Sequence, residues 1–321
     1  MSYSIVVLDA IASETIERMR TLLPPGFSLE GATENTESHR AELIRNADFA
    51  VSGQVAVTDE VLRSATRLKL LHKWGVGTDN FALDTAAELN IPVARTTGSN
   101  AVPVAEFTLG LMISALRHIA PAHERLAGGE WRSRRAATPF MLTGKTVGLV
   151  GFGAIAKALA KLLQGFGCDV VYFKPTSLSP EEESLHNVRH VSFSRLIQSA
   201  DVVSLHCPLT PATRGLVDRS VFEQMKSTAV LINTARGEIV DESALIWALN
   251  EKVIHAAAVD VYEVEPLPSN SPLTESNNLT HTPHLGAVTA DTFEPNVRRM
   301  FANIECVANG RGVPEIDSVL R

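Results

Sequence analysis

The sequence predicts an α/β protein built from two doubly wound units, each a parallel sheet covered by helices on both faces. The length of 321 residues suits two domains of ordinary size. Short apolar segments alternate with helical patterns through the first hundred residues, and the same alternation restarts near residue 146. Such alternation is typical of parallel sheets enclosed by helices. Two separate runs of it therefore predict two units.

The first run begins close to the N-terminus. Pro24-Pro25-Gly26 ends its first helix, and Thr58 caps a later one. The expected strands are residues 4–8, 48–52, 70–73 and 92–94, and the expected helices are residues 13–23, 38–46, 58–65 and 84–89.

One long helix is expected next, between the two runs. Asn100 caps it, Pro103 is tolerated in its first turn, and the pattern continues toward Leu126 until Gly128-Gly129 stops it. Residues 130–142 are basic and irregular. The second run then has expected strands at residues 146–150, 170–173, 201–205, 229–232, 255–259 and 279–281, helices between them, and a last helix near residues 291–309.

Composition and charge exclude several classes of protein. Hydrophobic residues make up 45% of the chain and charged residues 20%, as in ordinary globular proteins. A formal net charge of −7 gives no general attraction for nucleic acid or an anionic membrane, so we expect neither as a partner. Cys168, Cys207 and Cys306 are far apart and lack metal-ligand spacing, which indicates reduced thiols and predicts no metal site. Residues 1–9 fit a first strand better than a signal peptide, so we expect a cytoplasmic protein.

A glycine motif opens the second run. An apolar strand leads into Gly151-x-Gly153-x-x-Ala156, and a helix-forming segment follows directly. Gly151 permits a tight turn, Gly153 lets the backbone approach a pyrophosphate, and Ala156 allows close packing of helix on strand. The amides of Ala154 and Ile155 would face the phosphates at the positive end of the helix dipole. The motif predicts dinucleotide binding, with a plain strand–helix turn as the alternative.

Three later strands are each followed by unusual polar residues, at the edge where ligands bind in open α/β sheets. Arg236 could grip a carboxylate with two parallel hydrogen bonds, or form a surface ion pair. A carboxylate in the segment 260–265 could orient an imidazole, or belong to an ordinary polar turn. His284 follows the last strand, and a lone histidine is more often structural than catalytic. Together, behind a dinucleotide fold, these are the parts needed for hydride exchange with a carboxylated carbonyl compound.

Longer motifs extend this pattern in a fixed order. They are residues 75–80 (GVGTDN), 98–106 (GSNAVPVAE) and 205–213 (LHCPLTPAT), followed by the segments around Arg236, Glu265 and His284. By these motifs the sequence resembles, over nearly its whole length, the D-isomer-specific 2-hydroxyacid dehydrogenases, the family of phosphoglycerate dehydrogenase and hydroxypyruvate/glyoxylate reductase. An ordered set of this kind is far more specific than the glycines alone.

The resemblance implies roles for individual residues. Arg236 would hold the carboxylate and carbonyl oxygen of the substrate. His284 would exchange the proton, and Glu265 would hydrogen-bond to His284 and favour its protonated form. The backbone amides of Val76 and Gly77 would hold the substrate carboxylate from the other domain. The cofactor residues that the family's pattern implies, beside those of the glycine motif, are His206, Pro208, Thr213, Thr234, Ala235, Asp260 and Gly286, with Asp260 on the nicotinamide carboxamide.

The resemblance also implies a domain arrangement. A Rossmann cofactor domain, residues 101–285, is inserted into a flavodoxin-like substrate domain made of residues 1–100 and 286–321. The active site would lie in the cleft, where hinge closure expels water. Family members dimerise through the long helix after Asn100 and the arm around Trp131, so we expect a homodimer.

One departure from the family pattern concerns the cofactor. Where NAD enzymes of the family carry an acid that binds the ribose hydroxyls, this chain has Lys174, 23 residues after Gly151. Lys174 cannot accept a hydrogen bond from a 2′-hydroxyl, but it can pair with a 2′-phosphate, to which Thr176 or Ser177 can donate. We therefore favour NADP, with NAD as the alternative if Lys174 is merely solvated.

Further departures concern the substrate. Phe107 stands where many relatives have a polar residue, and the arm of Arg132, Arg134 and Arg135 beside Trp131 is unusually basic. Either could reflect a different substrate or dimer packing. Because the sequence stops at Arg321, we expect no additional regulatory domain.

We predict a nicotinamide-dependent reductase of small 2-oxo acids. A hydroxypyruvate- or glyoxylate-like substrate is the first expectation, followed by a 3-phosphoglycerate-like compound and sugar-derived 2-oxo acids. The alternative is a dinucleotide-sensing binding protein like the corepressor branch of the family, which keeps the same Arg, Glu and His.

Overall fold

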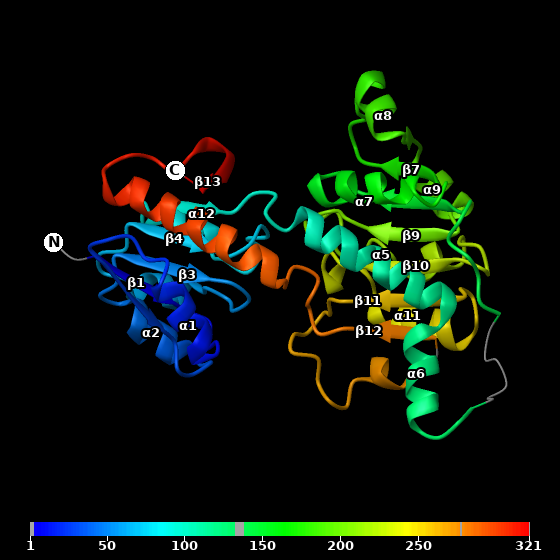
Figure 1. The fold of residues 1–321 in the computed structure, drawn as a ribbon, viewed down its shortest axis with the longest axis horizontal. Coiled ribbons are helices and arrows are strands. Elements are labelled where there is room, and N and C mark those ends of the chain that lie inside the picture. The colour runs from blue at the N-terminus through cyan, green and yellow to red at the C-terminus, as the bar shows by residue number, and fades with distance from the viewer. Residues whose placement is uncertain (1–2, 132–137, 277, 321) are drawn as a thin grey trace. The chain divides into compact units, whose positions relative to one another are not determined.

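The computed structural model describes residues 3–131, 138–276 and 278–320 (Figure 1). The chain divides into two compact units. Unit 1 comprises Met1–Asn100 and Thr289–Arg321, and unit 2 comprises Ala101–Val288. The chain leaves unit 1 after residue 100 and re-enters it after residue 288, three residues later than the boundary expected from the sequence.

Unit 1 is built on a six-stranded sheet of order β13-β5-β4-β3-β1-β2. Its strands are β1 (Tyr3–Val7), β2 (Phe27–Gly31), β3 (Phe49–Ser52), β4 (Leu70–Lys73), β5 (Val93–Arg95) and β13 (Ser318–Leu320). The parallel order 2-1-3-4-5 is the flavodoxin-like order, as predicted. Two strands were not anticipated: β2, and β13, which pairs antiparallel with β5 at the sheet edge.

Helices cover both faces of this sheet. They are α1 (Ser13–Arg20), α2 (Glu37–Ile44), α3 (Asp59–Ser64), α4 (Leu83–Glu88), α12 (Ala290–Ala308) and the 3-10 turn η3 (Glu315–Asp317). Successive β1 side chains alternate between faces, so Ile5 packs in the cluster with α1 and α12, and Val6 packs in the cluster with α2, α3 and α4. Thr58 caps α3 by accepting the backbone N–H of Val61, as expected.

Unit 2 is built on a seven-stranded parallel sheet of order β12-β11-β10-β9-β6-β7-β8. Its strands are β6 (Thr146–Val150), β7 (Asp169–Phe173), β8 (Arg189–His190), β9 (Val202–Leu205), β10 (Val230–Asn233), β11 (Ala256–Val259) and β12 (Leu279–His281). The order is that of a Rossmann fold, as predicted, with the switch point between β6 and β9.

The strands of unit 2 are apolar because both faces are covered. The helices are α5 (Ala101–Arg117), α6 (Ile119–Ala127), α7 (Ala154–Gln164), α8 (Pro180–His186), α9 (Phe193–Ser199), α10 (Arg219–Phe222) and α11 (Glu242–Asn250), with the 3-10 turns η1 (Gly237–Ile239) and η2 (Pro272–Glu275). In Figure 1, α5 and α7 lie side by side on one face. The cluster on the other face contains residues of α9, α10 and α11.

The prediction of a single long helix from Asn100 toward Leu126 is wrong. It is broken at His118, whose φ of 54° and ψ of 42° are left-handed, and α5 and α6 meet at a bend of 65°. Pro121 supplies a physical reason, because inside a continuous helix its ring would clash with the carbonyl of residue 117, whereas the first turn of α6 tolerates it. Among the described residues no single helix is long and apolar enough to cross a membrane, and α5 and α6 reach that length only as a bent pair.

Candidate active site

The predicted site residues of unit 2 gather at the carboxyl edge of its sheet. Each follows a strand or starts a helix at that edge, where parallel strands present their loops together. Arg236 follows β10, Glu265 lies in the loop after β11, and His284 lies in the loop after β12. Because β10, β11 and β12 are neighbours in the sheet, their three loops are adjacent.

The glycine motif forms a turn with open space beside a helix start. Gly151 has φ of +92°, and a Cβ built there would lie 2.6 Å from the carbonyl of His206 and the amide of Cys207, so only glycine fits. Gly153 needs no special φ, but a Cβ there would meet no atom within 4 Å. Gly153 is also the N-cap of α7, which has no side-chain cap. The first amides of α7, at Ala154 and Ile155, therefore suit a bound anion.

Lys174 directly follows β7. In the sheet, β7 lies next to β6, on the side opposite β9. Its carbonyl oxygen lies 3.1 Å from His190 Nε2, which fixes the backbone at the start of the loop. Glu182 on α8 pairs with Lys157 of α7 at 3.3 Å. The hydrogen bond from Lys157, with a smaller contribution from the charge of Lys174, lowers the pKa of Glu182. Thr176 is exposed in the same loop.

The loop after β9 contains His206, Pro208 and Thr213. The hydroxyl of Thr213 donates to the carbonyl of Pro208 at 2.6 Å and accepts from the amide of Thr210 at 2.8 Å, so the loop is closed on itself. His206 Nε2 lies 2.9 Å from the hydroxyl of Ser204. Burial lowers the pKa of His206 to about 4, so its ring is neutral near pH 7.

The loop after β10 is shaped by Asn233, which the sequence analysis did not single out. Its side-chain oxygen accepts from the amide of Ala235 at 3.1 Å, and its side-chain nitrogen donates to the carbonyl of Arg236 at 2.8 Å. Asn233 is 1% exposed. The signal available in the sequence was a polar amide directly after an apolar run, where a buried side chain needs hydrogen-bond partners. The hydroxyls of Thr234 and Thr108 lie 2.9 Å apart, which connects the same loop to α5.

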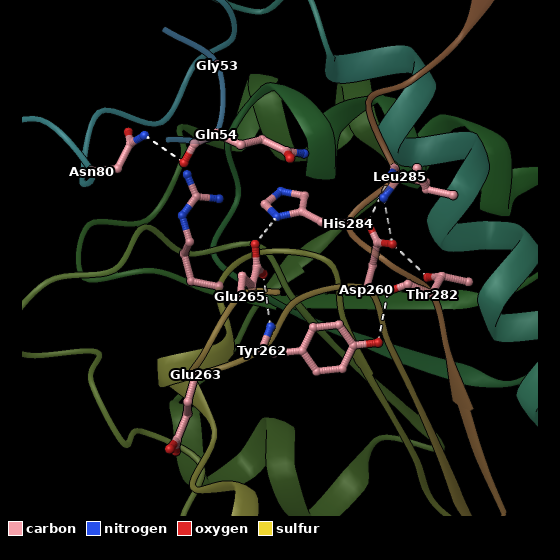
Figure 2. Close-up of polar contacts among 12 residues, drawn as sticks. Gly53, Gln54, Asn80, Asp260, Tyr262, Glu263, Glu265, Thr282, His284 and Leu285 are labelled. Carbon is pink, nitrogen blue, oxygen red and sulfur yellow. Dashed lines mark hydrogen bonds and ion pairs between the residues drawn. The ribbon is translucent and has the colours of Figure 1, made fainter. Parts of the chain in front are cut away.

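Asp260 connects the loops after β11 and β12. Its Oδ1 accepts from the Thr282 hydroxyl at 2.6 Å and from the Leu285 amide at 2.9 Å, and its Oδ2 accepts from the Gly286 amide at 2.8 Å. Asp260 is 2% exposed. Its contacts within the chain therefore hold the turn that carries His284 (Figure 2).

Glu265 and His284 form the central pair of the site. Glu265 Oε2 and His284 Nδ1 are 2.7 Å apart, and Figure 2 shows the two side chains pointing toward one another. Each side chain is 33% exposed. Burial pushes the pKa of Glu265 upward, but the hydrogen bond and charge of His284, the amide of Tyr262 and the charge of Arg236 together lower it. Glu265 is therefore an ionised partner for the imidazole at neutral pH.

Val76 and Gly77 lie in unit 1, in the loop after β4. Gly75 before them has φ of +140°, and its carbonyl accepts from the amide of Thr96 at 3.0 Å. The guanidinium of Arg95 donates to the carbonyl of Val76 at 3.4 Å. The loop is thus fixed to β5 and the residue after it.

The structure shows the surroundings of Phe107 and of Trp131, but not of the arginines beside Trp131. The ring of Phe107 on α5 lies beside Gly286, since a Cβ at Gly286 would be 3.5 Å from Phe107 Cδ1. Trp131 is 81% exposed, and Arg132, Arg134 and Arg135 lie outside the described residues. In the parts of the chain that the structure describes, no group of three or more His, Cys, Asp or Glu residues could hold a metal ion.

Comparison with known proteins decides the family. The profile of the D-isomer specific 2-hydroxyacid dehydrogenases, NAD binding domain, matches residues 109–286. The chain belongs to this family. The resemblance drawn from the sequence motifs is confirmed, and the match covers the region that contains the glycine motif, Arg236, Glu265 and His284.

Individual family relatives have several names. A D-3-phosphoglycerate dehydrogenase of Methanocaldococcus jannaschii is 36% identical over 288 residues, which are 89% of this chain and 54% of that protein. A glyoxylate reductase of Thermofilum pendens is 36% identical over 286 residues, 86% of this chain and 84% of that protein. The crystal structure of an NAD-dependent formate dehydrogenase from Staphylococcus aureus in complex with NAD is 27% identical, with a TM-score of 0.88 over 99% of both chains. The chain thus spans about half the length of the phosphoglycerate dehydrogenase.

Proposed function

We propose that the chain is a nicotinamide-dependent oxidoreductase that interconverts small 2-oxo acids and D-2-hydroxy acids. One observation carries the proposal: the His284–Glu265 pair, at 2.7 Å, sits at the same sheet edge as Arg236 and the open glycine turn. An imidazole paired with an ionised carboxylate is suited to proton exchange. The nearby guanidinium is suited to holding a carboxylate.

Each residue then has a task in the proposed reaction. The bound nicotinamide supplies or accepts the hydride. His284 Nδ1 is engaged by Glu265, so Nε2 is the nitrogen that gives a proton to the substrate oxygen during reduction and takes it back during oxidation. Glu265 stays ionised and stabilises the imidazolium. Arg236 holds the substrate carboxylate.

The same edge supports a dinucleotide. The amides of Ala154 and Ile155 would hold the pyrophosphate where Gly153 leaves space. Asp260 Oδ2 accepts a hydrogen bond from the Gly286 amide, and a carboxylate oxygen has the capacity to accept a second. Asp260 can therefore accept from the nicotinamide carboxamide while it holds the His284 turn.

We further propose NADP as the preferred cofactor. Lys174 stands at the end of β7, where a ribose-binding acid would otherwise be expected. The charge of nearby Lys157 is offset by its ion pair with Glu182, so Lys174 is the residue on which the proposal depends. A 2′-phosphate could pair with Lys174 and accept from the exposed hydroxyl of Thr176.

We also propose that the chain forms a homodimer through α6. No residue of α6 is buried within the described chain, and Ile119 and Leu126 are each 53% exposed. Exposed apolar side chains on a helix that buries none of its residues are typical of a protein interface. Light scattering of the wild type and of Leu126→Glu tests this, since the variant should shift toward the monomer mass.

The decisive experiment is a turnover assay with glyoxylate, hydroxypyruvate and 3-phosphohydroxypyruvate, each with NADH and NADPH. His284→Ala should abolish reduction, because no other group exchanges the proton at that position. Arg236→Lys should lose most turnover at saturating cofactor despite its retained charge, because an ammonium cannot make the two-point contact. His281→Ala is the matched control, an exposed histidine three positions before His284. Cofactor binding without turnover of any 2-oxo acid would overturn the enzyme proposal and favour a dinucleotide sensor.

A further inference from the structure

His284 occupies an unusual turn. It has φ of +54°, a left-handed conformation that costs free energy for a residue with a Cβ. Its amide donates to the carbonyl of Thr282 at 3.1 Å, an i to i+2 bond that spans only Pro283. Such a turn persists only where surrounding contacts hold it. The contacts around Thr282 therefore matter for the direction of the imidazole.

Tyr262 supplies one of these contacts from the neighbouring loop. Its hydroxyl donates to the same Thr282 carbonyl, at 2.9 Å (Figure 2). One oxygen therefore accepts from both Tyr262 and His284. The ring is 5% exposed and packs in the apolar cluster that contains Val259 and Leu279. Burial, followed by the charge of Asp260, raises the pKa of Tyr262 to about 12. The phenol thus stays protonated, and remains a donor, over the whole range in which enzymes are assayed.

The backbone of Tyr262 touches the other two members of the site. Its amide donates to Glu265 Oε1 at 3.1 Å, while Glu265 Oε2 faces His284. A Cβ at Gly237 would lie 1.9 Å from the carbonyl carbon of Tyr262 and 2.2 Å from its oxygen. Gly237 follows Arg236 directly, so the backbone of the Arg236 turn packs against the peptide group of Tyr262, with no room for a side chain between them.

We propose that Tyr262 is a positioning residue for the reaction. Its hydroxyl holds the His284 turn, its amide holds Glu265, and its peptide supports the turn after Arg236. The expected effect on turnover rests on the proposed function, whereas the contacts of Tyr262 with Thr282, Glu265 and Gly237 do not. Loss of the hydroxyl should leave Thr282 with a weaker anchor, so that the imidazole turns away from Glu265.

Tyr262→Phe tests the hydroxyl alone, because the ring and both backbone contacts remain. Tyr3→Phe is the matched control, since the Tyr3 hydroxyl donates to the carbonyl of Ala308 at 3.1 Å in unit 1. We expect Tyr262→Phe to lower kcat about tenfold, with the dissociation constant for the cofactor unchanged. Tyr3→Phe should change neither.

The pH profile separates positioning from general stability. Among the described residues of unit 2, Glu265 is the charged group that contacts the imidazole. Asp260 accepts from the amide of Leu285, the residue after His284, and the charge of Arg236 acts on Glu265. A looser His284–Glu265 pair stabilises the imidazolium less, so the high-pH limb of reduction should move to lower pH in Tyr262→Phe. In a Glu265→Gln background the same tyrosine change should move the limb no further, because the pair is already gone.

The NMR signal of the His284 Nδ1 proton, in nitrogen-15-labelled protein, keeps this test independent of turnover. In Tyr262→Phe this signal should move upfield relative to wild type and Tyr3→Phe, because the hydrogen bond to Glu265 becomes longer. A wild type that reduces no 2-oxo acid but shows this difference defeats the proposed function and leaves the positioning role intact. An active wild type in which Tyr262→Phe changes neither the high-pH limb nor the NMR signal of the His284 Nδ1 proton overturns the role of Tyr262.

Discussion

In unit 1 the strand at the switch point, β1, ends two residues before Asp9, whereas in unit 2 the strand at the equivalent place, β6, is followed directly by Gly151. The Asp9 carboxylate accepts from the amides of Gly53, Gln54 and Val55, at 2.5, 2.7 and 3.0 Å. It is 8% exposed. The corresponding position in unit 2 has no such carboxylate, and Gly153 leaves space beside the first amides of α7.

The comparison teaches that loops at the carboxyl edge of a doubly wound sheet present backbone amides, and that local residues decide whether those amides are satisfied within the chain. In unit 1 the Asp9 carboxylate satisfies the amides of the loop after β3 and fixes that loop. Lys73 and Asn80 reinforce the same loop: the Lys73 ammonium donates to the carbonyl of Gly53, and the Asn80 amide donates to the carbonyl of Val55 at 2.8 Å. In unit 2 the first amides of α7 have no side-chain cap, and Gly153 of the dinucleotide motif leaves space beside them that suits an external anion.

The largest expected effect comes from filling the open position. Gly153→Asp should weaken cofactor binding at least about 100-fold, since a carboxylate would occupy and repel the pyrophosphate site. The melting temperature should hardly change, because a Cβ at Gly153 meets no atom within 4 Å. Titration of NADPH by fluorescence and a thermal melt measure the two quantities. Gly312→Asp, at an equally unobstructed glycine of unit 1, is the control.

Emptying the filled position should affect stability instead. Asp9→Ala leaves three backbone donors without their acceptor and should lower the free energy of unfolding by about 2–3 kcal/mol. Hydrogen exchange at Gly53, Gln54 and Val55 should accelerate, while the dissociation constant for the cofactor stays the same. Asp84→Ala, at an exposed acid of unit 1, provides the baseline. Unchanged exchange at the three amides would show that Asp9 does not hold this loop.

The cofactor preference sharpens the comparison within unit 2. Wild type should bind NADPH more tightly than NADH, and Lys174→Asp should reverse the order by about tenfold or more in the affinity ratio. Added salt should weaken the wild-type preference if Lys174 is exposed to solvent. Lys161→Asp makes the same charge change in the last turn of α7 and should leave the ratio alone. A wild type that prefers NADH would defeat the NADP proposal without touching the dehydrogenase proposal.

The smallest effect concerns pH. The lowered pKa of Glu265 keeps its carboxylate ionised above the ordinary value of 4.5, so its support of His284 is present there and is lost only as pH falls further. Glu265→Gln removes that support and should shift the high-pH limb of reduction to lower pH. The kcat profile from pH 5 to pH 10 measures the shift. An unmoved limb would separate Glu265 from proton exchange.

Much of the fold could be predicted because its signals are local. Strands β4, β6 and β12 begin and end where the apolar segments indicated. The elements that were missed depend on distant partners or on single dihedral angles. Strand β13 exists because Ser318–Leu320 pairs with β5, more than 200 residues earlier. The break at His118 requires one residue in a left-handed conformation, and a histidine in the sequence does not predict that conformation.

The candidate site divides in the same way. The sequence by itself determined which chemical groups follow the strands, because Arg236, Glu265 and His284 stand where apolar runs end, and it determined that Gly151 opens a turn. Only the tertiary structure decided how those groups are held. Asp260 and Tyr262 shape the loops through contacts between separate segments of the chain, and the carboxylate of Asp9 holds the loop after β3 in unit 1. The physical reason is that propensity and spacing act along the chain, whereas buried hydrogen bonds are chosen by what the folded chain brings within reach.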